Sequence, residues 1–266
     1  MATGHAELFA SRIAVLSQTQ LPREMTQFDL SLDHPAKLPD LSGALAMNGS
    51  PDGQLLAYID KEEATFRLVI HNRRARVDTV ILVSQARLNA PRWSPDGKRL
   101  YYTRAVRGLS KIFVWENERH RQLTFGSAID TDPVEANHRV YFSSNRSGGV
   151  HVHYLAPDGV LAQVTHEDGS LLPQATPNGK TLFYLQQNTE GAAVMKMDMS
   201  TGLATSIHQK DAIPAMTLSP DGKRLLIATT KQLLMMNDHG QVLQQRDWPD
   251  VIWLSWSGSK SWAKWH

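Results

Sequence analysis

Histidine and aspartate side chains are the residues of this 266-residue sequence whose spacing could do chemistry. His151 and His153 stand two apart in "HVHYL", so on a strand both imidazoles would face one side and could begin a metal site. Aspartates also recur in tight turns before glycine. These turn positions are Asp52, Asp96 and Asp221, with Asn178 in a fourth turn. An Asp or Asn before Gly is what a tight turn requires, so a structural role is the simpler interpretation of the turn aspartates.

The sequence lacks the motifs that would build a familiar catalytic centre around these residues. It contains no Gly-x-Ser-x-Gly, no Gly-x-Gly-x-x-Gly, no Walker-type loop and no His-Glu-x-x-His. It also has no cysteine, which excludes a thiolate zinc site, a cysteine nucleophile and a disulfide framework. We therefore predict that the chain is not an enzyme and has no catalytic residue, no bound metal and no cofactor.

The elements that position these residues follow an internal repeat. A turn with the pattern Ser-Pro-Asp-Gly, followed by an apolar strand, occurs in "NGSPDGQLLAYID", "RWSPDGKRLYYTR" and "TLSPDGKRLLIAT", and with Thr-Pro-Asn-Gly in "QATPNGKTLFYLQ". The spacing is roughly 40–45 residues, except for one interval about twice as long, and this period is typical of β-propeller blades. A degenerate copy from Pro133 fills the long interval, and a weaker copy from Leu254 ends the chain.

The repeat predicts an all-β fold, a six-bladed β-propeller with four-stranded antiparallel blades. Turn signals recur too often, and apolar runs are too short, for helices. We expect one domain over residues 1–266, with the strands of residues 1–44 completing the C-terminal blade and closing the ring. The predicted repeats span 45–90, 91–132, 133–172, 173–215, 216–253 and 254–266.

In such a fold, the third strands of the repeats can be aligned to interpret the two histidines. In this alignment His151 occupies the same position as Phe113, Met195 and Leu234. His153 occupies the same position as Trp115, Met197, Met236 and His71. Because these positions are largely apolar and a third metal ligand is missing, packing between blades is preferred over a metal site.

The repeats resemble those of the TolB family. The resemblance rests on "WSPDGKRLYYTR", on the "SSNRSG" of residues 143–148, and on "QLT" and "QVT" near the ends of two repeats. It implies a non-enzymatic scaffold of the bacterial envelope that binds a protein or a small polar ligand. Similar repeats also form the periplasmic sensor part of membrane-anchored winged-helix transcriptional regulators, whose DNA-binding and membrane segments would lie outside this chain. Both functions remain open.

The segments before the inner strands of a propeller gather at one mouth of its channel, and here they are acidic. The candidate binding residues are Asp40, Asp130, Asp132, Asp168, Asp211, Asp250 and Trp253. One hypothesis is a mouth that binds a cation, a basic peptide segment or a polar ligand. The alternative is that connections are polar and that aspartates cap turns.

Composition limits the partners and the location. The formal net charge of +2 gives no sign of nucleic-acid binding, and Arg73, Arg74 and Arg76 are best interpreted as a solvated turn. No apolar run approaches the roughly 18 residues of a membrane span. A periplasmic location is expected from the family resemblance and would require a leader or anchor that is not in this chain. The sequence does not predict the oligomeric state.

Overall fold

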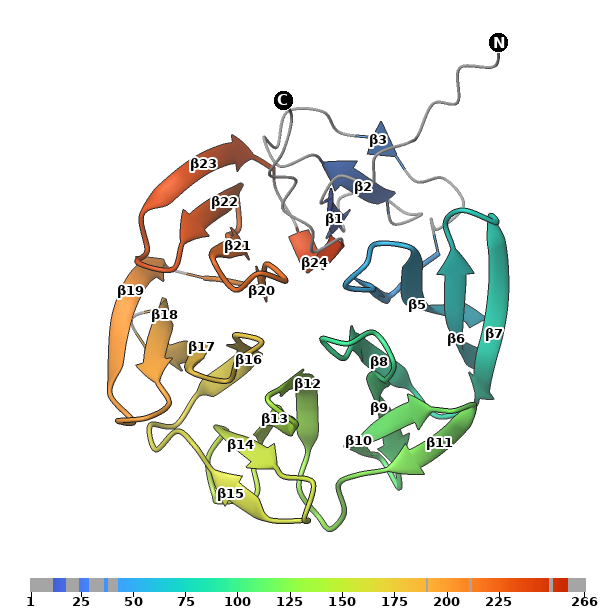
Figure 1. The fold of residues 1–266 in the computed structure, drawn as a ribbon, viewed down its shortest axis with the longest axis horizontal. Coiled ribbons are helices and arrows are strands. Elements are labelled where there is room, and N and C mark those ends of the chain that lie inside the picture. Colours follow the sequence, from blue (N-terminus) through green and yellow to red (C-terminus); the bar gives the residue numbers. More distant parts are fainter. Residues whose placement is uncertain are drawn as a thin grey trace.

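The computed structural model describes residues 12–17, 24–28, 36–37, 43–189, 191–210, 212–248 and 251–257. Every regular element in these ranges is a β-strand, and none of the described segments is a helix that could cross a membrane. The strands form four-stranded sheets arranged around a centre, with one end strand of each sheet innermost (Figure 1). This confirms the prediction of a β-propeller with four-stranded antiparallel blades.

Five blades consist of consecutive strands. The first holds β4 (Ala46–Gly49), β5 (Leu55–Glu62), β6 (Thr65–Asn72) and β7 (Val77–Ser84). The second holds β8 (Leu88–Trp93), β9 (Leu100–Val106), β10 (Leu109–Glu116) and β11 (Arg119–Gln122). The third holds β12 (Asp130–Ala136), β13 (Arg139–Ser144), β14 (His151–Leu155) and β15 (Leu161–Gln163).

The fourth blade holds β16 (Ser170–Ala175), β17 (Thr181–Asn188), β18 (Gly191–Asp198) and β19 (Ala204–Lys210). The fifth holds β20 (Ala215–Leu218), β21 (Arg224–Ala228), β22 (Gln232–Asn237) and β23 (Val242–Asp247). A further sheet joins β24 (Val251–Ser257) to β1 (Arg12–Ser17), β2 (Glu24–Phe28) and β3 (Ala36–Lys37) in the order β24-β1-β2-β3.

Strand β24 hydrogen-bonds to the inner strands of both the fifth and the first blade. The Asn48 side-chain amide of β4 donates to Ser255 Oγ of β24 at 3.2 Å. On the other side, the indole N–H of Trp256 donates to the carbonyl oxygen of Thr217 in β20 at 3.4 Å. These two bonds link the C-terminal strand to blades that lie at opposite ends of the sequence.

After the first blade, each inner strand begins three residues, or one residue for β20, before the predicted start of its repeat. The limits predicted at residues 91, 133, 173, 216 and 254 fall inside β8, β12, β16, β20 and β24. The reason is that each Ser-Pro-Asp-Gly turn follows the innermost strand, so the residues leading into the turn already belong to the blade. The approximate repeat limits and the blade limits thus differ by a few residues, and the same turns belong to the same blades.

The Ser-Pro-Asp-Gly turns are held by their own side chains. In the second blade, Ser94 Oγ donates to Asp96 Oδ1 at 2.6 Å, and the same carboxylate oxygen accepts the Lys98 backbone N–H at 3.1 Å. Gly97 closes the turn with a φ of 70°, a conformation that favours glycine. The serine–aspartate bond recurs at Ser50 and Ser219, at 2.6 Å in both turns. The turn aspartates thus have the structural role that was predicted.

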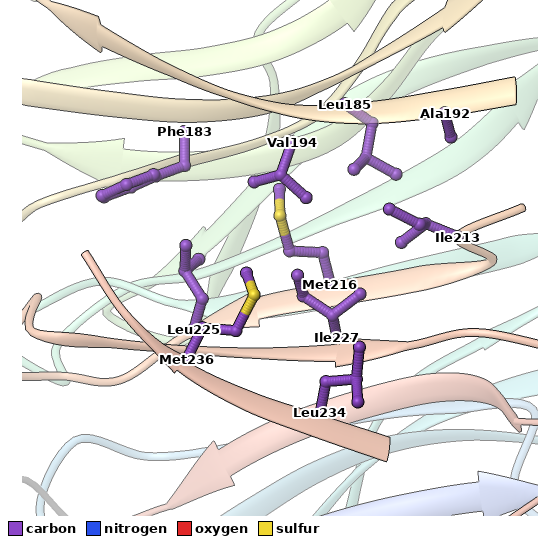
Figure 2. Close-up of a cluster of buried hydrophobic side chains, with 10 residues drawn as sticks. All are labelled: Phe183, Leu185, Ala192, Val194, Ile213, Met216, Leu225, Ile227, Leu234 and Met236. Carbon is purple, nitrogen blue, oxygen red and sulfur yellow. The ribbon is translucent and has the colours of Figure 1, made fainter. Parts of the chain in front are cut away.

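The hydrophobic core lies between the faces of neighbouring blades. Figure 2 shows the interface of the fourth and fifth blades, where side chains of β17 and β18 face those of β21 and β22. The members from the fourth blade include Phe183, Leu185 and Val194, and those from the fifth include Leu225 and Ile227. All five side chains are buried, and each contributes roughly 1.5–3 kcal/mol to the hydrophobic stabilisation.

Replacing Gly240 with alanine is expected to destabilise the protein more than the same change at Gly159. Both glycines close a turn between the third and fourth strands of a blade, with φ values of 82° and 88°. A Cβ at Gly240 would overlap the backbone carbonyl of Ile207 in the neighbouring blade, whereas Gly159 has nothing within 4 Å. Gly159→Ala should therefore cost about 1–2 kcal/mol from its backbone conformation.

Gly240→Ala should cost about 1–3 kcal/mol more than that, because the clash must be relieved by moving one blade against the next. Urea unfolding of the two variants measures the difference. Equal losses of stability would show that the turn after β22 does not pack against β19 in solution.

Candidate functional site

The inner strands give the propeller two distinct ends. Each inner strand starts at a connection from the previous blade and ends at a turn, and cross-blade hydrogen bonds keep these strands aligned. Asn48 Oδ1 accepts the backbone N–H of Trp93 at 2.8 Å, and Gln174 Oε1 accepts that of Leu218 at 3.3 Å. We call the two ends the connection end and the turn end.

The structure describes three of the predicted binding residues in full. Asp40, Asp211 and Asp250 lie outside the described residues, as does the side chain of Trp253. Asp130, Asp132 and Asp168 are found at the start of β12 or just before β16, so the connections of neighbouring blades do bring them to one end. Their environments differ sharply.

Asp130 is fully buried and is held by three side chains. It accepts hydrogen bonds from Ser144 Oγ at 2.6 Å and from Arg146 Nη2 at 2.7 Å, and Lys111 Nζ lies 3.4 Å from its other oxygen. Lys111 is itself 2% exposed and also donates to the carbonyl of Ala128. The structure therefore gives Asp130 a role in joining the second blade to the third, and ligand binding by Asp130 stays a prediction.

Asp132 lies deeper along the same strand, at an irregularity in the pairing of β12. Its φ of 53° is in the left-handed region, as are those of Ala90 and Leu172, which precede prolines at equivalent bulges. Burial raises the pKa of Asp132, and the positive charge of Arg92 on the neighbouring inner strand opposes that rise. Asp132 is thus a half-buried carboxylate inside the ring rather than an open rim residue.

Asp168 is exposed and caps its own connection. Its Oδ1 accepts the backbone N–H groups of Val150 and Gly169, both at 2.7 Å. This is the turn-capping role offered as the alternative to ligand binding. The carboxylate still faces solvent at the connection end, so its contribution to a binding surface stays a prediction.

Two exposed apolar side chains at the connection end were not predicted. Phe125 is 66% exposed and Ile129 is 45% exposed, and both lie in the connection between β11 and β12. Ile129 is fixed in place, because its backbone N–H donates to Asn145 Oδ1 at 2.7 Å. The signal in the sequence is the pair of large apolar residues inside an otherwise polar connection.

The turn end holds a cavity of about 280 Å³ that sequence reasoning also missed. Its wall includes one equivalent residue from four inner strands, three positions before the proline of each turn. These residues are Asn48, Arg92, Gln174 and Thr217. Trp93, Glu135 and Trp256 occupy the next position in their own strands and also line the cavity.

The two histidines are buried, and their alignment needs a correction. His153 pairs with Phe142 and Phe113 pairs with the equivalent Tyr102, so His153, not His151, occupies the position of Phe113. The cause is the longer turn between β13 and β14, which delays the third strand. His153 stacks on Phe142 with ring centroids 6.1 Å apart, and burial lowers its pKa.

The packing interpretation agrees with the burial of both rings, which are 7% and 2% exposed. Within the part of the chain that the structure describes, no three histidine, aspartate or glutamate side chains are grouped so as to hold a metal ion.

Known structures share this architecture at low sequence identity. The crystal structure of TolB from Acinetobacter baumannii is 19% identical, with a TM-score of 0.81, and the match covers 94% of this chain and 67% of that one. A putative TolB from Agrobacterium tumefaciens is 20% identical, with a TM-score of 0.62, covering 80% of this chain and 95% of that one. A prolyl endopeptidase structure is 14% identical, with a TM-score of 0.61, covering 90% of this chain and 40% of that one.

At such identities these structures establish the fold alone. No curated protein matches the sequence. The family model described as the TolB beta propeller domain, however, matches residues 2–248, which is most of the chain. This match agrees with the four-stranded blades and their Ser-Pro-Asp-Gly turns, and the chain belongs to the TolB β-propeller domain family.

Proposed function

We propose that this chain is a non-enzymatic binding propeller of the bacterial envelope, which docks a protein partner on its connection end. The observation that carries the proposal is the exposed pair Phe125 and Ile129, held on an ordered connection beside acidic connections. Aromatic anchors surrounded by polar residues are typical of protein–protein interfaces. Membership of the TolB family supports binding rather than catalysis, and supports a periplasmic location.

The acidic residues would complete this surface. Asp168 and Glu167 are exposed in the connection before β16. In the sequence, Asp40, Asp211 and Asp250 likewise precede the inner strands β4, β20 and β24. A negative rim would favour a partner with a basic segment and would speed its association. The partner's charge is therefore part of the proposal.

The proposal also includes a closed ring of six blades in which β24 and the N-terminal strands form the last blade. Its support is the antiparallel pairing of β1 with β24, from Arg12 opposite Ser257 to Val15 opposite Leu254. A closed ring leaves only short, protected strand edges and fixes both ends of the central channel. It would hold the connections in one fixed arrangement, as a docking surface requires.

A periplasmic sensor domain of a membrane-anchored winged-helix regulator is the second candidate function. The observation that favours it is the cavity at the turn end, whose volume of about 280 Å³ suits a small molecule rather than a protein segment. A reading frame that continues upstream into a membrane span and a winged helix would favour the sensor.

Pull-down from envelope extract tests the docking surface. Wild-type chain is expected to retain a partner that Phe125→Ala loses, because truncation of a central aromatic anchor costs about 2 kcal/mol or more of binding. Asp168→Asn keeps the turn-capping oxygen while removing the charge, so it should weaken binding and reduce its salt dependence. Leu203→Ala, at a residue 71% exposed in the outer turn after β18, is the control and should change nothing.

The same pull-down with and without a chelator tests whether a cation takes part. A partner that is retained equally by wild type, Phe125→Ala and Asp168→Asn would overturn the assignment of the docking surface to the connection end.

A further inference from the structure

A cleft with a volume of about 580 Å³ lies between the first and second blades, which stand side by side (Figure 1). This volume is within the usual range for ligand sites. The first blade contributes Leu55, Ile70 and Ile81 to the walls, and the second contributes Trp93 and Trp115. All five side chains belong to, or pack against, one apolar cluster that joins the two blades. We call this site the inter-blade cleft.

The inter-blade cleft runs outward from an inner strand to an outer one. Trp93 ends β8, the innermost strand of the second blade, whereas Thr79 and Ile81 belong to β7, the outermost strand of the first. Neighbouring strands are about 4.8 Å apart, so the three spacings across a blade give the cleft a length of about 14 Å. An extended ligand suits this length better than a compact one.

The charged groups of the cleft balance each other. Among the described residues that line it, Lys98 is the only basic side chain and Glu118 the only acidic one, and both are exposed in turns of the second blade. A charged ligand would lose hydration against the apolar walls without meeting an excess of opposite charge. The lining therefore favours an uncharged ligand.

One buried donor on the wall has no acceptor. The indole nitrogen of Trp93 forms no hydrogen bond with the described part of the chain, and the side chain is only 8% exposed. Trp256 occupies the equivalent position on β24, and there the indole donates to the Thr217 carbonyl of the preceding blade at 3.4 Å. Because a buried N–H without an acceptor is costly, a ligand oxygen at the inner end of the cleft would be stabilised.

We propose that the inter-blade cleft binds a proline-rich peptide segment of about four or five residues in the polyproline II conformation. Such a segment advances about 3.1 Å per residue, so its length matches that of the cleft. Its pyrrolidine rings pack on the indole faces of Trp93 and Trp115, as in other aromatic-lined grooves that bind proline-rich segments.

The backbone chemistry of proline also suits these walls. Proline has no N–H, so the bound segment leaves no donor unpaired against apolar side chains. One of its carbonyl groups accepts the indole N–H of Trp93. That nitrogen is covered in the free protein, so binding requires the half-buried side chains of the wall to move apart slightly. The cleft is at the turn end, and the proposal does not rest on the partner proposed for the connection end.

Calorimetric titration of the full chain with octaproline, blocked at both ends, tests the proposal. Octaproline is expected to bind at least about tenfold more tightly than a blocked Gly-Ser peptide of the same length, because it is already extended and has rings to bury. Trp115→Ala should weaken octaproline binding at least about tenfold. Trp93→Phe keeps an aromatic ring but removes the donor, so it should weaken binding about three- to tenfold.

Two controls accompany these variants. Leu243→Ala, at a 50% exposed residue on the outer strand of the fifth blade, should bind octaproline like wild type. Blocked single proline should bind at least about tenfold more weakly than octaproline, because it fills only part of the cleft. Equal affinity for the two would assign the cleft to a compact ligand and overturn the proposal.

Equal binding of octaproline and the Gly-Ser peptide to wild type, or binding of neither, would overturn the proposal even if the tryptophan variants failed to fold. Wild-type affinity for octaproline in a folded Trp115→Ala variant would overturn it as well.

Discussion

Replacing Asp130 with alanine is expected to lower the free energy of unfolding by about 3–5 kcal/mol. The carboxylate is fully buried between the second and third blades, where it is the acidic partner of Lys111 and Arg146. Its removal would leave the Lys111 ammonium, 2% exposed, without a countercharge at 3.4 Å and with little access to water. The loss should appear in urea unfolding as a lower midpoint with an unchanged slope.

Two further variants distinguish an unpaired charge from simple loss of packing. Asp130→Leu combined with Lys111→Met should recover much of the loss, because it replaces a buried ion pair with apolar groups of similar size. Asp168→Ala removes an exposed aspartate at the same end and should cost only about 1 kcal/mol, the usual value of a capping bond. A loss below about 1 kcal/mol for Asp130→Ala would contradict the buried network.

A disulfide between positions 12 and 257 is expected to form readily and to stabilise the protein by about 4–5 kcal/mol. Arg12 and Ser257 are opposite each other in the β1–β24 pairing, and directly opposed residues of antiparallel strands lie within the Cα separation of a disulfide. The chain has no cysteine of its own, so Arg12→Cys with Ser257→Cys gives a single possible bridge. The bridge closes nearly the whole chain into a loop, which explains the large expected effect.

Oxidised and reduced samples would be compared by mobility on a non-reducing gel and by urea unfolding. Arg12→Cys with Ser200→Cys is the matched control, since Ser200 lies in the outer turn between β18 and β19. Oxidation that fails to bridge positions 12 and 257, or that bridges the control pair equally well, would refute closure of the ring by the N-terminal strands.

Local chemistry explains why the blades could be predicted from the sequence. The Ser-Pro-Asp-Gly turns are complete within a few residues, as the bond from Ser94 to Asp96 illustrates, so each copy can be recognised without knowledge of the rest of the fold. The apolar strands that follow the turns can be predicted from their own hydrophobic alternation and length alone. Repetition then makes each assignment support the others.

The environment of the acidic residues depends on contacts that are distant in the sequence and could not be predicted. In the sequence Asp130 resembles any other connection aspartate, because its ion-pair partners are distant: Lys111 lies in β10 and Arg146 in the turn between β13 and β14. The alignment of His151 with Phe113 was wrong for a related reason, because a longer turn shifted the third strand. The cavity at Arg92 likewise requires inner strands from several blades to meet at the turn end.

Site-specific photocrosslinking in cells tests most directly whether the connection end docks a protein. A photoreactive phenylalanine analogue would replace Phe125, which is 66% exposed, and in a second variant Leu203, which is 71% exposed in an outer turn. The expected result is a discrete covalent adduct with one protein from position 125, weakened by Asp168→Asn, and none from position 203. An absence of adducts at position 125, or the same adducts from both positions, would contradict the proposed function.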